Sequence, residues 1–166
     1  MMTFALVLAV ALQAPDSARA VRWERALNET TDSLDHVRGA AAAFRVDLRN
    51  ASHDLVVVRA AQVRATCGAA DAPLQALERL LTGEVYDPRA RSAQERLRSG
   101  TTELRRTLTR CQREWQTGSR PTISGADSLR AWGPYRTAQL DAALRRYLGL
   151  VRSFMKQANL RKPAVS

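Results

Sequence analysis

The sequence predicts an all-α protein, an antiparallel helical bundle of three long helices plus one short helix in up-down-up-down order. Ala, Leu, Arg, Glu and Lys make up about half of the 166 residues, a composition typical of long helices. Apolar side chains recur at alternating spacings of four and three, whereas a strand would repeat every second residue. The connections between the apolar segments are short, which favours antiparallel neighbours.

Residues 1–20 are predicted to form a secretory signal peptide. Residues 4–12 are apolar and uncharged, Pro15 follows, and Ala18-Arg19-Ala20 is a small-x-small cleavage pattern. The apolar run is well short of the about 20 residues that span a bilayer. The first three residues carry no Lys or Arg, so a helix of residues 4–14 packed on the bundle is the alternative. After cleavage we expect a soluble, secreted or periplasmic chain without a transmembrane segment. Its single helical-bundle domain would cover residues 21–160, with a flexible tail over 161–166.

The first predicted helix begins near Trp23 and carries an unbroken apolar stripe. No proline occurs between Val21 and Thr66, and the stripe passes residues 50–52 in phase. These features favour one long helix that ends at Gly68, and the alternative is a break at Asn50-Ala51-Ser52, where Ser52 would cap a second helix. The stripe comprises Trp23, Leu27, Thr30, Leu34, Val37, Ala41, Phe44, Leu48, Ala51, Leu55, Val58, Gln62 and Ala65.

Three further helices follow. A short helix spans residues 71–83, with Asp71 and Pro73 at its start and Gly83 at its end. Asp87-Pro88 starts the next helix, which ends at Gly118, and the last helix runs from about Ser124 to Leu160. Pro134 is expected to kink the last helix or to separate its first turns. The predicted buried stripes are Ala93, Leu97, Thr101, Leu104, Leu108, Cys111 and Trp115, then Leu140, Leu144, Tyr147, Val151, Phe154 and Ala158.

Cys67 and Cys111 are predicted to form a disulfide bond, because export makes such a bond permissible. Closing this loop would stabilise the fold by about 3–4 kcal/mol in the chain-entropy model. Two buried free thiols are the alternative. No C-x-x-C or C-x-x-C-H motif occurs, and two Cys with two His argue against zinc, so we expect no cofactor.

One acidic group has a spacing that suits a loosely held divalent cation. Glu29, Asp32 and His36 lie three, four and seven residues apart and share one exposed ridge of a helix. A solvated helix face is the plainer interpretation. Residues 39–43, Gly-Ala-Ala-Ala-Ala, would permit close helix packing, or would leave a shallow apolar groove for a ligand.

The sequence gives no support for catalysis. No serine stands in a G-x-S-x-G motif, neither histidine has a placed partner, and no glycine-rich phosphate loop is present. We therefore expect a protein that is not an enzyme.

Positive charge concentrates in the last helix. The chain has 26 Lys and Arg against 16 Asp and Glu, and residues 121–166 hold eight basic and two acidic side chains. Arg145, Arg152 and Lys156 align on one outer stripe with Arg146 beside it, a pattern that attracts anionic surfaces. Nucleic acid is an unlikely partner, because the chain is predicted to be exported and no aromatic residues interleave the stripe. A compositional preference for Arg, with 24 Arg against 2 Lys, is the alternative explanation.

The sequence therefore predicts an exported, non-catalytic helical bundle. It would bind a protein partner or an anionic envelope component through exposed helix faces. The alternative function is a small-ligand or metal carrier of the cell envelope that uses the Ala-rich segment or the acidic ridge. The long apolar stripe of the first helix could equally build a homodimer.

Overall fold

The computed structural model describes residues 4–50, 52–117 and 123–160. Within these ranges the chain is helical and contains no strand, so the predicted all-α bundle is confirmed. The elements are α1 (Phe4–Asn50), α2 (His53–Ala69), α3 (Asp71–Gly83), a single 3₁₀ turn (Pro88–Ala90), α4 (Arg91–Thr117) and α5 (Ile123–Gln157).

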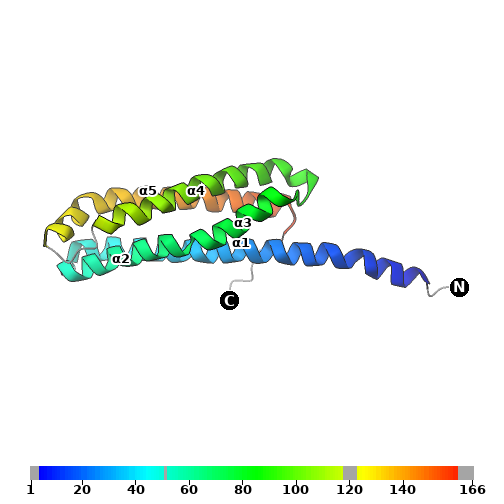
Figure 1. The fold of residues 1–166 in the computed structure, drawn as a ribbon, viewed down its shortest axis with the longest axis horizontal. Coiled ribbons are helices and arrows are strands. Elements are labelled where there is room, and N and C mark those ends of the chain that lie inside the picture. Colours follow the sequence, from blue (N-terminus) through cyan, green and yellow to red (C-terminus); the bar gives the residue numbers. More distant parts are fainter. Residues whose placement is uncertain (1–3, 51, 118–122, 161–166) are drawn as a thin grey trace.

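The helices form four antiparallel rods, with α2 and α3 placed end to end as the second rod (Figure 1). Both α1 and α4 contact the α2–α3 rod on one side and α5 on the other. The first turns of α1 extend beyond the other helices at one end of the bundle (Figure 1). Within the part of the chain that the structure describes, none of the helices has the length and apolar character that spanning a membrane requires.

The prediction of one helix from Trp23 to Gly68 is wrong, because the chain reverses direction after Asn50. Ser52 caps the new helix, and its side chain accepts a hydrogen bond from the Leu55 backbone N–H at 3.4 Å. An ion pair of 2.6 Å between Arg59 Nε and Asp47 Oδ2 then joins α2 to α1. The alternative of a break at residues 50–52 is therefore confirmed.

The buried stripe changes phase at this turn. Every predicted stripe residue from Trp23 to Leu48 is buried, whereas Leu55 and Val58 are 38% and 51% exposed. Ala51 lies outside the described residues. After the turn the core side chains lie two positions before those of the predicted stripe, and they keep the four-three spacing through both α2 and α3. This second stripe comprises Val56, Ala60, Val63, Cys67, Ala70, Leu74, Leu77 and Leu81.

Because the second stripe is continuous, α2 and α3 behave as one bent rod. Ala70 between them keeps helical angles, φ −74° and ψ −11°. Pro73 follows at the start of α3, where the missing proline N–H costs least. The predicted bounds of the short helix, residues 71–83, are confirmed.

The predicted buried stripes of α4 and α5 are also confirmed. The expected separation of the first turns at Pro134 did not occur, because α5 is continuous from Ile123 to Gln157. The chain after α5 turns at Asn159, whose φ is 52°, and the Leu160 N–H bonds the Met155 carbonyl at 2.9 Å, a common way to end a helix. Gly118 and the expected tail over 161–166 lie outside the described residues.

Candidate functional site: a cationic groove between α4 and α5

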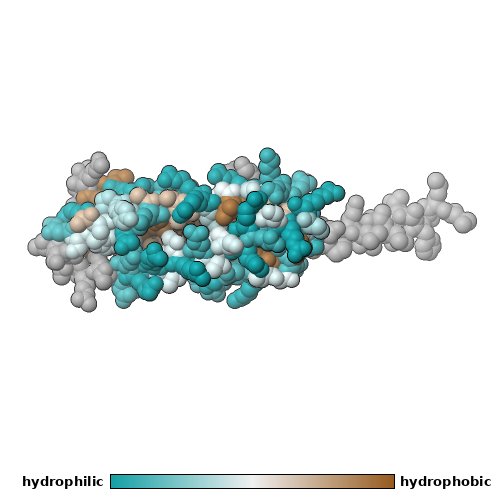
Figure 2. Space-filling model, turned by 90° about the horizontal axis from the view of Figure 1, so that it is seen from above, coloured by the Kyte–Doolittle hydropathy of each residue, from teal (hydrophilic) through white to brown (hydrophobic). Residues whose placement is uncertain are grey.

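A groove of about 410 Å³ lies between α4 and α5, within the size range of small-molecule sites. Figure 2 looks down on this side of the bundle, where apolar side chains are visible between hydrophilic ones. We call it the cationic groove. Its charged lining residues are Arg106, Arg110, Arg136, Arg146, Glu103 and Glu114.

The floor of the cationic groove is part of the core. Cys111, Trp115 and Leu140 line it and are almost completely buried. Cys111 forms the predicted disulfide bond with Cys67 of α2, with 6.3 Å between the two Cα atoms. The Trp115 ring packs edge-on against the Phe44 ring, with 4.7 Å between the ring centroids. The groove therefore rests on a cross-linked, well-packed base.

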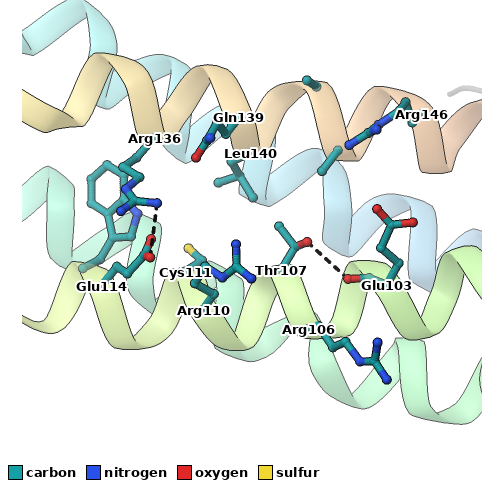
Figure 3. Close-up of a pocket in the computed structure, with 13 residues that line it drawn as sticks. Glu103, Arg106, Thr107, Arg110, Cys111, Glu114, Arg136, Gln139, Leu140 and Arg146 are labelled. Atoms are coloured by element: carbon teal, nitrogen blue, oxygen red, sulfur yellow. Dashed lines mark hydrogen bonds and ion pairs between the residues drawn. The ribbon is translucent and has the colours of Figure 1, made fainter.

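The arginines of the groove differ in their pairing. Arg136 Nη1 lies 3.2 Å from Glu114 Oε1, so this arginine is largely neutralised. Arg110 of α4 and Arg146 of α5 line the groove (Figure 3). Among the described residues, neither of them has a carboxylate within 4 Å. Arg106 lies at the rim, with its guanidinium directed away from α5 (Figure 3).

A second, shallower hollow continues over the outer side of α4. It is lined by Arg105, Arg106, Arg110 and Arg113, together with two threonines. Arg105 is occupied, since its Nε lies 2.8 Å from Asp71 and its Nη1 lies 2.6 Å from Glu78. The hydrogen bond between Arg105 and Asp71 lowers the pKa of Asp71 and raises that of Arg105. Arg105 thus joins α4 to α3.

Three other arginines of α4 differ from Arg105 in their exposure and ion pairing. Arg106, Arg110 and Arg113 are exposed, and no ion pair joins any of them to another residue in the described part of the chain. Their positive charges are therefore presented to the solvent along one side of the groove.

An apolar slot of about 330 Å³ adjoins the other end of the cationic groove. Tyr147 contributes its ring, while its hydroxyl lies 3.0 Å from the buried Thr101 Oγ1. Burial raises the pKa of Tyr147 well above its usual value, so the side chain is neutral. Glu103, Thr107 and Arg146 line both hollows. The apolar lining residues of the slot are Gly100, Leu104, Ala143, Tyr147 and Leu150.

The four basic residues predicted on α5 are all exposed, and of these four Arg146 is the one that lines the hollows between α4 and α5. Arg146 lines the cationic groove beside α4. Arg145 Nη2 instead pairs at 2.9 Å with Asp141, and Arg38 of α1 lies 3.9 Å from the same carboxylate. Arg152 and Lys156 lie outside the groove lining.

The other candidate ligand sites gain no support. Glu29, Asp32 and His36 are exposed on α1, and no group of three or more His, Cys, Asp or Glu side chains in the described ranges could hold a metal ion. Ala41 of the Ala-rich segment is buried in the core. Gly39 has open space around it, so no neighbouring helix approaches closely there.

The arginines that α4 contributes to the cationic groove and the second hollow were not predicted from the sequence. Arg106, Arg110 and Arg113 follow the same four-three spacing as the core stripe, which marks them as one face of a helix. That pattern could have identified the charged face, but not Arg136 and Arg146, which belong to another helix. Neither a protein-family model, nor a curated protein, nor a solved structure matches this chain.

Proposed function

We propose that this protein is exported and, without catalysing a reaction, binds an anionic component of the cell envelope at the α4–α5 surface. The observation that carries the proposal is the set of arginines around two adjoining hollows, without carboxylate partners among the described residues. Arg106, Arg110 and Arg146 line the cationic groove, and Arg106, Arg110 and Arg113 line the second hollow. Unpaired guanidinium groups are well suited to carboxylate and phosphate ligands, which they bind through two parallel hydrogen bonds.

Two features support export. The N-terminal segment has the apolar run and the small-x-small pattern of a secretory signal. Cys67 and Cys111 are bonded to each other, and disulfide bonds persist mainly in oxidising compartments outside the cytosol.

An anionic component fits the site better than a protein partner chosen by apolar contacts. The charged rim and the shallow second hollow lie on the same helix, so an extended anionic surface could contact Arg106, Arg110 and Arg113 together. Such a contact is electrostatic, and it should weaken as salt is added.

Sedimentation with vesicles tests the proposal. The processed chain should pellet with vesicles of phosphatidylglycerol and phosphatidylcholine, but not with phosphatidylcholine alone. The triple variant Arg106→Glu/Arg110→Glu/Arg146→Glu should lose at least about tenfold in retention, because each surface charge contributes roughly 1 kcal/mol.

The control variant Arg25→Glu/Arg45→Glu/Arg96→Glu makes the same change in net charge at exposed positions outside the groove. It should retain most of the binding. Equal losses in the two triple variants would show that only net charge matters, and the proposal would fail.

A further inference from the structure

The structure points to the ligand class of the cationic groove. We infer that the groove and the apolar slot together bind a single-chain fatty acid, with its carboxylate at Arg110 and Arg146 and its acyl chain in the slot. This inference rests on the proposed function, since it names the anionic compound that the same surface would hold.

The cationic groove and the apolar slot adjoin each other. Glu103, Thr107, Ala143 and Arg146 line both of them, so a molecule could occupy the slot and still reach the arginines. Arg146 thus stands at the junction, where the headgroup of an amphiphile would lie. Figure 3 shows its side chain lying along α5 at the edge of the groove.

The walls of the slot are mostly apolar, which suits an acyl chain. Leu104, Tyr147 and Leu150 supply apolar walls, and the Tyr147 hydroxyl is already bonded to Thr101. Ala143 presents only a methyl group to the slot, whereas Leu150 packs closely against Gly100, where an added Cβ would lie 2.5 Å from Leu150 Cδ1. A hollow with mostly apolar walls that adjoins cations matches an acyl chain with an anionic headgroup.

The charged residues where the groove meets the slot favour a headgroup with a single negative charge. Arg136 is paired with Glu114, and the carboxylate of Glu103 lines the junction. The charges of Arg110, Arg146 and Glu103 leave one net positive charge, which a single carboxylate balances, whereas a doubly charged headgroup would leave one negative charge uncompensated. One carboxylate between Arg110 and Arg146 therefore suits the charges that are present.

Calorimetric titration of the processed chain with laurate, acetate and dodecanol at neutral pH tests the inference. Laurate should bind with one-to-one stoichiometry and at least about tenfold more tightly than acetate, which lacks the chain, or dodecanol, which lacks the charge. Dodecyl phosphate should bind less tightly than laurate. Equal affinity for acetate and laurate, or tighter binding of dodecyl phosphate, would overturn the inference.

Two variants separate the parts of the site. Leu150→Ala removes an apolar wall of the slot at a residue outside the lining of the cationic groove, and it should weaken laurate binding at least about tenfold while vesicle retention stays unchanged. Arg146→Gln should weaken both. Far-ultraviolet circular dichroism and the melting temperature check that each variant is folded. If Leu150→Ala does not fold, Leu150→Val removes less of the same wall and replaces it.

The results distinguish the two proposals. Vesicle retention that depends on the groove arginines, combined with no preference for laurate, refutes the fatty-acid inference and leaves the proposed function standing. Laurate binding that is sensitive to Leu150→Ala, without any vesicle retention, supports the inference and refutes binding of an anionic envelope surface.

Discussion

Arg145 and Arg146 are consecutive residues of α5, yet only one of them is held by a neighbouring carboxylate. Arg145 Nη2 lies 2.9 Å from Asp141 Oδ2, whereas Arg146 lines the cationic groove (Figure 3). Asp141 also lies 3.9 Å from Arg38 of α1, so it holds Arg145 on a part of α5 that lies toward α1. Two positive charges that look equivalent in the sequence therefore differ in their availability to a ligand.

Breaking the Cys67–Cys111 bond should destabilise the bundle without unfolding it. The Cys67→Ser/Cys111→Ser variant should lose about 3–4 kcal/mol in the free energy of unfolding, because the cross-link restricts the unfolded chain. Its melting temperature should fall by about 10 °C in calorimetry. Reductant should have the same effect on the wild-type chain and none on the variant. Two alkylatable thiols in the denatured, unreduced protein would contradict the bond.

Gly133 is expected to be needed for the packing of α5 on α1. A Cβ at this position would lie 2.7 Å from Phe44 Cε1, inside the core. Gly133→Ala should therefore destabilise the protein by about 1–3 kcal/mol in urea titrations. Gly39→Ala is the matched control, because nothing lies within 4 Å of the position that its methyl group would take, and it should stabilise the helix by roughly 0.5–1 kcal/mol. Equal effects of the two substitutions would contradict the packing.

Glu84 should make stability depend on pH in the acid range. The Trp23 Nε1–H donates to Glu84 Oε1 at 2.6 Å, and this bond, with help from Arg22, lowers the pKa of the Glu84 carboxyl. A lowered pKa stabilises the fold above the ordinary pKa of a glutamate, about 4.3, and that contribution is lost as pH falls through the folded pKa.

Urea unfolding between pH 3 and 7 measures this effect. Relative to wild type, Glu84→Gln should be less stable at neutral pH, and the difference should shrink toward pH 3. Tyr86→Phe, a change at a residue that packs on the same Trp23 ring, should leave the pH dependence intact. A constant difference between wild type and Glu84→Gln across the range would show that the Glu84 carboxylate has no special role.

Processing should remove residues 1–20 on export. Intact mass and N-terminal sequencing of the exported protein should identify Val21 as the first residue. In the unprocessed chain the Arg19 guanidinium carbon lies 5.1 Å from the centroid of the Tyr86 ring. Processing removes this contact, so the free energy of unfolding of the processed chain should be about 1 kcal/mol lower. An unprocessed mass in the cell-envelope fraction would contradict cleavage.

The buried stripes of α1, α4 and α5 could be predicted from the sequence, but the turn after α1 and the buried stripe of α2 could not. The stripe from Trp23 to Leu48 is a local property of one helix, and every predicted member is buried. After the turn, two registers two residues apart both place mostly apolar side chains at the four-three spacing. Leu55 and Val58 favoured the wrong register, and Val56 and Ala60 belong to the correct one. Only the tertiary contact of α2 with α1 and α4 selects between them.

The candidate site could be predicted only in part for a similar reason. Spacing along one helix identified Arg146 as exposed and basic. The groove, however, needs the relative placement of α4 and α5, which brings Arg110 and Arg146 to the same hollow. The pairing of Arg145 with Asp141 was visible as an i, i+4 spacing. The pairing of Arg136 with Glu114 joins two helices and had no local signal.

The central claim is that the groove, and not the general positive charge of α5, binds the anionic ligand. Vesicle sedimentation of Arg146→Gln and Arg145→Gln tests it most directly, because the two variants remove the same charge at adjacent positions. Arg146→Gln should weaken retention on phosphatidylglycerol vesicles by about fivefold, the effect of roughly 1 kcal/mol. Arg145→Gln should change it by less than about twofold, since that charge is already paired. Equal retention of the two variants would contradict the claim.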